Sequence, residues 1–128
     1  GSTVSKPLAP IQTNRFFICR ILHQDKCPKD KTLILIESSR AFGTGTHETK
    51  SGCIEALECL KDIKANKILD IGTGSGSLSF IAEKLWNKAE ILACDIDNAS
   101  VEIAKENASF NNSNIQFYQN TYENILLD

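Results

Sequence analysis

Residues 67–76 constrain this chain more than any other stretch, because they predict a buried strand that turns directly into a helix. The apolar run at 68–71 is followed by three glycines that alternate with small hydroxyl residues. Leu78, Ile81 and Leu85 then recur at helical spacing. Glycine tolerates a positive φ and allows close approach of the backbone to a ligand. Because the first N–H groups of a helix have no partner within it, the turn is suited to an anion or a polar ligand.

A second apolar strand, predicted over residues 90–94, ends in Asp95. A carboxylate at the end of the second strand of a βαβ unit is placed to accept hydrogen bonds from ribose hydroxyls. The dinucleotide fingerprint is G-x-G-x-x-G, whereas this chain has G-x-G-x-G with Asp70 two residues before its first glycine. This compact form, DIGTGSG, resembles the first motif of the S-adenosylmethionine-dependent methyltransferases. We therefore expect a nucleoside-cofactor site here.

Composition sets broad limits on fold and partners. The chain has 128 residues, of which 41% are hydrophobic, and domains most often have about 100–150 residues. No apolar run approaches the ~18 residues of a membrane span, and a net charge of −2 gives no reason to expect nucleic-acid binding through bulk electrostatics. Residues 1–2 look like the scar of a cleaved tag. We expect residues 1–11 to be this scar with an extended lead-in, and residues 12–128 to form a partial methyltransferase domain.

The five cysteines form no C-x-x-C pair, and the simplest interpretation is reduced thiols in a cytoplasmic protein. Cys53, Cys59 and Cys94 fall in predicted helices or strands, where we expect them to act as small apolar residues. His23 and Cys27 share a predicted loop, but a four-ligand set is missing, so no metal site is expected.

Alternating strand and helix patterns predict an α/β fold with a parallel, doubly wound sheet. Residues 15–22 and 32–37 are predicted to be strands joined by a polar loop, as an N-terminal β-hairpin. Asp97 or Asn98 can cap the third helix. Only three strands of the main sheet precede Asp128, so we expect a fragment whose sheet is incomplete at its C-terminus. The predicted helices span residues 48–61, 77–86 and 99–110, and the main strands span 68–71, 90–94 and 115–118.

A longer pattern is more specific than the glycine turn alone. Residues 41–49 read AFGTGTHET, and the glycine motif follows some twenty residues later. The combination resembles the bacterial ribosomal protein L11 methyltransferases, which methylate amino groups of a large-subunit ribosomal protein. Residues 95–97, 104–108 and 111–112 also look like that family, and the resemblance covers roughly residues 12–128. It implies a Rossmann-like class I methyltransferase fold and S-adenosyl-L-methionine as the cofactor.

The resemblance also implies roles for individual residues. Gly72 matches the family's cofactor-contacting glycine, Asp95 its ribose-binding acid, and residues 42–46 the loop that covers the cofactor. Lys50 stands where the family usually has a second threonine, and residues 37–40 replace its usual acidic-Pro-Gly approach. The candidate cofactor-binding residues are Phe42, Gly43, Thr44, Thr46, Thr49, Lys50, Gly72, Thr73, Gly74, Gly76, Asp95, Ile96 and Asn120.

Several of these candidates have a simpler alternative interpretation. Phe42 could be a core aromatic residue that anchors its loop, and His47 could merely start a helix. Asn120 could edge the adenine pocket or lie in a surface loop. We expect Asp70 to order the glycine turn by accepting backbone N–H bonds, a role that requires no contact with the cofactor.

Methyl transfer from a sulfonium chiefly requires alignment of nucleophile, methyl group and sulfur, so we assign no catalytic residue. The leading hypothesis is the cofactor-binding portion of a protein methyltransferase, with a ribosomal protein of the large subunit as its partner and a fragment that is itself inactive. Open sheet edges predict self-association, and no membrane or direct nucleic-acid partner is expected. The alternatives are a methyltransferase of the same fold acting on RNA or a small molecule, an NAD-dependent oxidoreductase, and a truncated domain that only binds.

Overall fold

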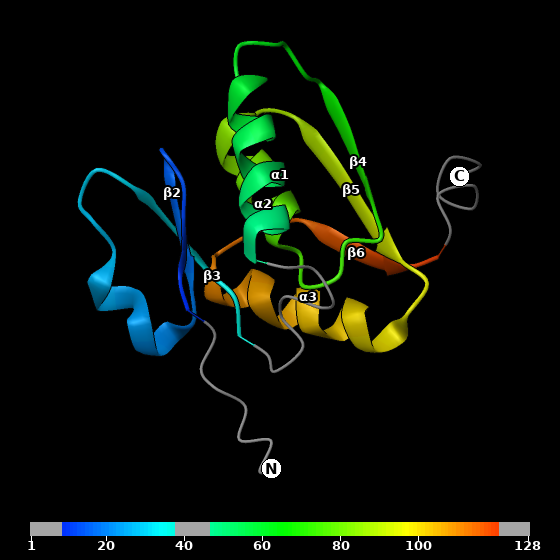
Figure 1. The fold of residues 1–128 in the computed structure, drawn as a ribbon. Helices are drawn as coiled ribbons and strands as arrows, with labels where there is room; N and C mark the ends of the chain where they lie inside the picture. Colours follow the sequence, from blue (N-terminus) through cyan, green and yellow to red (C-terminus); the bar gives the residue numbers. More distant parts are fainter. Residues whose placement is uncertain (1–8, 38–46, 121–128) are drawn as a thin grey trace.

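Two three-stranded sheets enclose a pair of helices in the computed structural model, which describes residues 9–37 and 47–120 (Figure 1). At residues 47–51 only the backbone is described. The N-terminal sheet contains β1 (Ile11–Gln12), β2 (Phe16–Cys19) and β3 (Thr32–Leu35), and the second sheet contains β4 (Lys67–Ile71), β5 (Glu90–Asp95) and β6 (Gln116–Gln119). The helical segments are η1 (Ile21–Lys26), α1 (His47–Cys59), α2 (Ser77–Leu85) and α3 (Asn98–Phe110).

The second sheet confirms the predicted α/β order. Its strands run in the order β4-β5-β6 and every pair is parallel, with Ile68 opposite Ile91 and Leu92 opposite Gln116. Helices α2 and α3 provide the two crossovers, as the alternating strand and helix patterns predict. Since parallel strands end on the same side of a sheet, the glycine turn after β4 and Asp95 at the end of β5 come together.

Strand β4 is less buried than its apolar sequence predicts. None of its five residues is fully buried, and Ile71 is 55% exposed. Among the described strands β4 pairs with β5 alone, so one edge and part of its surface are open. Ile63, in the connection that leads into β4, is also largely exposed.

The predicted N-terminal hairpin is wrong, because β2 and β3 are parallel, with Phe17 opposite Leu33. The segment between them contains the 3-10 helix η1, which returns the chain to the starting end of β2 before β3 begins. The antiparallel partner of β2 is instead β1, where Ile11 lies opposite Ile18. The apolar residues of the two segments indicated strands, but they could not indicate whether the strands pair in a parallel or an antiparallel direction.

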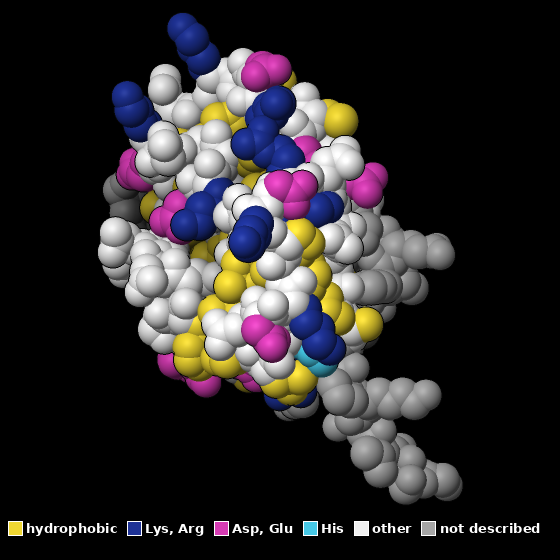
Figure 2. Space-filling view, turned by 90° about the vertical axis from the view of Figure 1, so that its left-hand side faces the viewer, with side chains coloured by type: hydrophobic (Ala, Val, Ile, Leu, Met, Phe, Trp, Pro, Cys, Tyr) yellow, Lys and Arg dark blue, Asp and Glu magenta, His cyan; other side chains and the backbone are white. Residues whose placement is uncertain are grey.

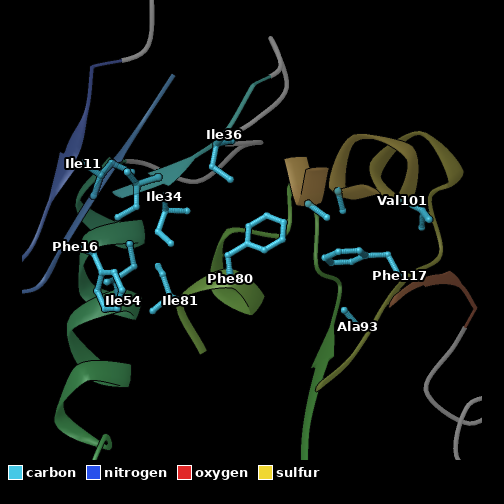
Figure 3. Close-up of a cluster of buried hydrophobic side chains, with 13 residues drawn as sticks. Ile11, Phe16, Ile34, Ile36, Ile54, Phe80, Ile81, Ala93, Val101 and Phe117 are labelled. Atoms are coloured by element: carbon cyan, nitrogen blue, oxygen red, sulfur yellow. The ribbon is translucent and has the colours of Figure 1, made fainter. Parts of the chain in front are cut away.

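One hydrophobic core joins both sheets (Figure 3). Phe80 on α2 lies between the side chains of the N-terminal sheet, such as Ile34, and those of the second sheet, such as Phe117. The rings of Phe80 and Phe117 meet edge to face, with centroids 5.8 Å apart. The start of α2, where the glycine turn ends, is therefore fixed by packing from both sides.

Helix α3 follows its predicted pattern. Val101, Ala104 and Ala108 are buried, and the Asp97 carboxylate accepts a bond from the backbone N–H of Ser100, which makes Asp97 the N-cap.

The cysteines divide into buried and exposed pairs. Cys94 on β5 is buried, as predicted, and Cys19 on β2 is buried too. Cys53 and Cys59 on α1 are exposed, so the expectation that they pack as small apolar residues is wrong.

Charged side chains are mixed on the face over the N-terminal sheet, where lysine and arginine alternate with acidic and apolar residues (Figure 2). Within residues 9–37 and 47–120, no helix combines the length and the apolar character that crossing a membrane requires.

Candidate cofactor-binding site

The glycine turn between β4 and α2 adopts the left-handed backbone that its sequence predicts. Gly72, Gly74 and Gly76 have φ angles of 72°, 56° and 89°, a region that costs other L-residues roughly 1–2 kcal/mol. A Cβ atom added at Gly72 or Gly74 would meet nothing within 4 Å, whereas one at Gly76 would lie 3.0 Å from the ring of Phe80. The first two glycines thus leave an open space, and the third permits tight packing.

Backbone hydrogen bonds hold the turn against the end of β5. The N–H groups of Gly72 and Thr73 both donate to the carbonyl oxygen of Cys94, at 2.8 and 3.0 Å. The Gly76 N–H closes the turn on the carbonyl of Thr73 at 3.0 Å. These bonds set the turn beside the residue that follows Cys94.

That residue is Asp95, whose carboxylate faces the turn. One oxygen, Oδ2, accepts the backbone N–H of Gly74 at 3.0 Å, and the other, Oδ1, accepts the N–H of Asp97 at 2.9 Å. Asp95 is only partly buried. Each carboxylate oxygen can accept more than one bond, so acceptor capacity is left for the hydroxyl groups of a ligand.

Asp70 orders the turn through side chains, and the prediction that it accepts backbone N–H groups is wrong. Its Oδ2 accepts the hydroxyl groups of Thr73 at 2.9 Å and Ser79 at 2.5 Å. Thr73 is in the turn and Ser79 is in the first turn of α2, so one carboxylate ties the end of β4 to both. Sequence analysis missed Ser79, which lies nine residues from Asp70 and carries no motif signal of its own.

Two further candidates follow the neighbouring strands. Ile96, which is 75% exposed, comes directly after β5, and the exposed Asn120 comes directly after β6. Both therefore lie at the edge of the sheet that carries the glycine turn. The side-chain amide of Gln119 donates to the Ile96 carbonyl at 3.4 Å, which links the two strand ends.

The remaining candidates are on the N-terminal side of α1. Thr49 and Lys50 are in the first turn of α1, where only the backbone is described, and Phe42, Gly43, Thr44 and Thr46 lie outside the described residues. In Figure 1 the chain enters α1 at the lower end of the helix, and the connection from β4 to α2 lies toward the same end.

The buried side-chain amide of Asn107, on α3, also bonds to the turn, and the sequence analysis gave this residue no role. Asn107 on α3 has no exposed surface, and its Nδ2 donates to the carbonyl oxygen of Ser75 at 3.0 Å. The available signal was an asparagine on the inner face of α3, between Ala104 and Ala108. A polar residue on an apolar helix face needs a hydrogen-bond partner.

One buried thiol, Cys94, lies beside the site. Burial raises the pKa of Cys94, which precedes Asp95, above its ordinary value. In the described part of the chain, no group of three or more histidine, cysteine or acidic residues is arranged to hold a metal ion.

Comparisons with known proteins place these features in a family. The profile of "Ribosomal protein L11 methyltransferase (PrmA)" matches residues 2–127. A ribosomal protein L11 methyltransferase from Caldicellulosiruptor saccharolyticus is 48% identical over 93 residues, which cover 72% of this chain and 30% of that protein. One from Dictyoglomus thermophilum is 40% identical over 111 residues, or 86% of this chain and 36% of that protein.

A solved structure gives the same result in three dimensions. The crystal structure of ribosomal protein L11 methylase from Lactobacillus delbrueckii subsp. bulgaricus superposes with a TM-score of 0.74 at 29% identity, over 90% of this chain and 58% of that one. The chain spans about a third of the length of the curated relatives it matches.

Proposed function

The chain belongs to the ribosomal protein L11 methyltransferase (PrmA) family, and from this premise we propose that it is the cofactor-binding portion of an S-adenosylmethionine-dependent protein methyltransferase. The observation that carries the proposal is the pairing of the glycine turn with Asp95. The open space at Gly72 and Gly74 lies beside a carboxylate that already accepts the N–H of Gly74. That combination fits a nucleoside whose ribose is bound by the acid while the backbone of the turn approaches closely.

The described residues supply hydrogen-bonding groups and open space of the kind that S-adenosylmethionine needs. Asp95 supplies acceptors for the ribose hydroxyls, and Gly72, Thr73 and Gly74 supply backbone that no side chain obstructs. Ile96 and Asn120, at the ends of the next strands, would edge the base. The family resemblance adds Thr49 and Lys50, and it adds Phe42, Gly43, Thr44 and Thr46 from outside the described residues. When bound, the cofactor supplies a methyl group already activated on a sulfonium.

The chain's own contribution is alignment of the cofactor. A lysine amine must lose a proton before it can attack, since its ordinary pKa is about 10.4. Removal of that amine from water favours the neutral form. We assign this task to no residue of this chain.

We propose amino groups of a large-subunit ribosomal protein as the methyl acceptor, in line with the names of the relatives. A cytoplasmic location follows from a ribosomal substrate. The proposed unit is residues 12–128, a partial domain, and we expect the chain alone to transfer few or no methyl groups. Among the described strands, β4 and β6 each pair on one side only, and we expect the other side to favour self-association through its backbone donors and acceptors.

The experiment is isothermal titration of the 128-residue chain with S-adenosylhomocysteine and, separately, with NAD. We expect binding of S-adenosylhomocysteine, weakened by the partial domain, and no binding of NAD. Binding of NAD alone would overturn the proposal. A parallel assay with radiolabelled S-adenosylmethionine and ribosomal protein L11 should show little transfer, and a rate equal to that of a longer relative would refute the inactivity of the chain.

A further inference from the structure

We propose that Asn107 is a positioning residue that fixes the glycine turn to the N-terminal sheet and thereby sets the affinity of the cofactor site. The inference rests on the proposed function, because it concerns the same turn. Asn107 is on α3, outside the turn, and the N-terminal sheet does not include β4, the strand that leads into the turn.

The amide of Asn107 joins two segments that are far apart in the sequence. Its Oδ1 accepts the backbone N–H of Glu37 at 2.8 Å, and its Nδ2 donates to the carbonyl oxygen of Ser75 at 3.0 Å. Asn107 is completely buried and Ser75 is 6% exposed, so water does not compete for the bond between them. A buried amide that loses one of these partners leaves a polar group unsatisfied, which is the costly case.

The connection continues beyond Glu37 to the segment that joins β2 of the N-terminal sheet to η1. The Glu37 carboxylate accepts bonds from the Arg20 guanidinium at 3.1 and 3.2 Å, and from the backbone N–H of Ile21 at 2.6 Å. A continuous set of hydrogen bonds therefore runs from the start of η1, through Glu37, two residues after β3, to the glycine turn. The side chain of Asn107 forms the link between these two parts of the chain.

The direction of these bonds explains their effect on the turn. Ser75 lies between Gly74, whose N–H points to Asp95, and Gly76, which packs against Phe80. A peptide carbonyl fixed at Ser75 fixes the peptide plane that leads into Gly76. The amides before and after it then keep the orientation that the cofactor site requires.

Asn111 provides a matched control one helical turn away. Its side chain accepts the backbone N–H of Leu35 at 2.8 Å and donates to the Leu35 carbonyl at 2.7 Å. It thus joins α3 to the same N-terminal sheet through the same type of side chain. Its side-chain partners are the backbone of Leu35 and the backbone carbonyl of Asn107, and neither belongs to the glycine turn.

The test compares Asn107→Ala, Asn107→Asp and Asn111→Ala in the 128-residue chain. Asn107→Asp keeps an acceptor for Glu37 but places a carboxylate oxygen against the carbonyl of Ser75. We measure the melting temperature, the affinity for S-adenosylhomocysteine, and amide hydrogen exchange over residues 72–77 without ligand. Loss of one buried hydrogen bond corresponds to about a tenfold change in an equilibrium constant.

We expect both Asn107 variants to bind S-adenosylhomocysteine about tenfold more weakly or worse, and to exchange faster in the turn by a similar factor. Asn111→Ala should lower the melting temperature while leaving affinity and turn exchange near the values of the unsubstituted chain. Equal effects of Asn107→Ala and Asn111→Ala on affinity and exchange would reduce Asn107 to a structural role and overturn the inference.

Failure of the proposed function would look different. If the unsubstituted chain bound no S-adenosylhomocysteine, the cofactor proposal would fail, while the exchange measurement would still test the tie to the turn. Unchanged turn exchange in Asn107→Asp would overturn the inference even if all variants bound the ligand. Should Asn107→Ala fail to fold, Asn107→Asp and Asn111→Ala still give the comparison.

Discussion

Replacement of Asp95 by alanine should weaken cofactor binding far more than replacement of Asp97, although the two acids are only two residues apart. The Asp95 carboxylate holds the backbone N–H of Gly74 in the turn. Asp97 accepts the N–H and hydroxyl of Ser100, and so caps α3. Asp95→Ala therefore removes the carboxylate that faces the glycine turn and that we propose binds the ribose, and Asp97→Ala removes a helix cap.

Asp95→Ala should chiefly reduce the affinity for the cofactor, whereas Asp97→Ala should chiefly reduce the folding stability. A hydrogen bond to a charged group contributes about 1.5–3 kcal/mol, so loss of a single ribose bond weakens binding roughly 10- to 150-fold. Asp95→Ala also releases the Gly74 N–H, which loosens the turn and adds to the loss. Loss of an N-cap costs about 0.5–2 kcal/mol of folding stability. For Asp97→Ala we therefore expect a lower melting temperature with affinity changed by less than about threefold.

The assay is isothermal titration with S-adenosylhomocysteine, accompanied by thermal melting followed by circular dichroism. Asp95→Asn serves as an intermediate case, because it keeps one neutral acceptor but not the charge. Equal losses of affinity in Asp95→Ala and Asp97→Ala, at equal loss of stability, would refute the assignment of Asp95 to the ribose.

Three further predictions concern the turn, the thiols and the open strand. Gly74→Val should stay folded but lose S-adenosylhomocysteine binding, and tight binding by this variant would mean that the turn is purely structural. Gly76→Ala should lower the melting temperature, because its Cβ would lie 3.0 Å from the buried ring of Phe80. Burial raises the pKa of Cys19 from its ordinary 9.0 to about 11, so its contribution to stability is complete below pH 9 and is lost as the pH rises toward 11. Thiol titration at pH 8 should label the exposed Cys53 and Cys59 quickly and Cys19 only on unfolding, and rapid labelling of Cys19 would contradict its burial. Sedimentation should show association that increases with concentration, because β4 pairs on one side only among the described strands. A monomer at all concentrations would exclude pairing through its other edge.

The sequence determined the second sheet and the centre of the site. Apolar runs, helical spacing and alternating glycines are local patterns, and they were sufficient to predict β4, β5 and β6, the two crossover helices, and the turn beside Asp95. The Asp97 cap was also predictable, because an N-cap bonds to backbone within the next few residues.

Only the tertiary structure decided which partners distant groups find. The parallel pairing of β2 with β3 depends on the path of η1, and the pattern of either strand fits both directions. Asp70 binds the Ser79 hydroxyl because α2 folds back over the end of β4. Asn107 reaches Ser75 and Glu37 because the C-terminal half of α3 lies beside both the glycine turn and the segment that follows β3, which places residues 32 and 70 positions away next to it. Periodicity specifies which face of an element is buried, but the group that a buried polar side chain meets is set by packing between elements.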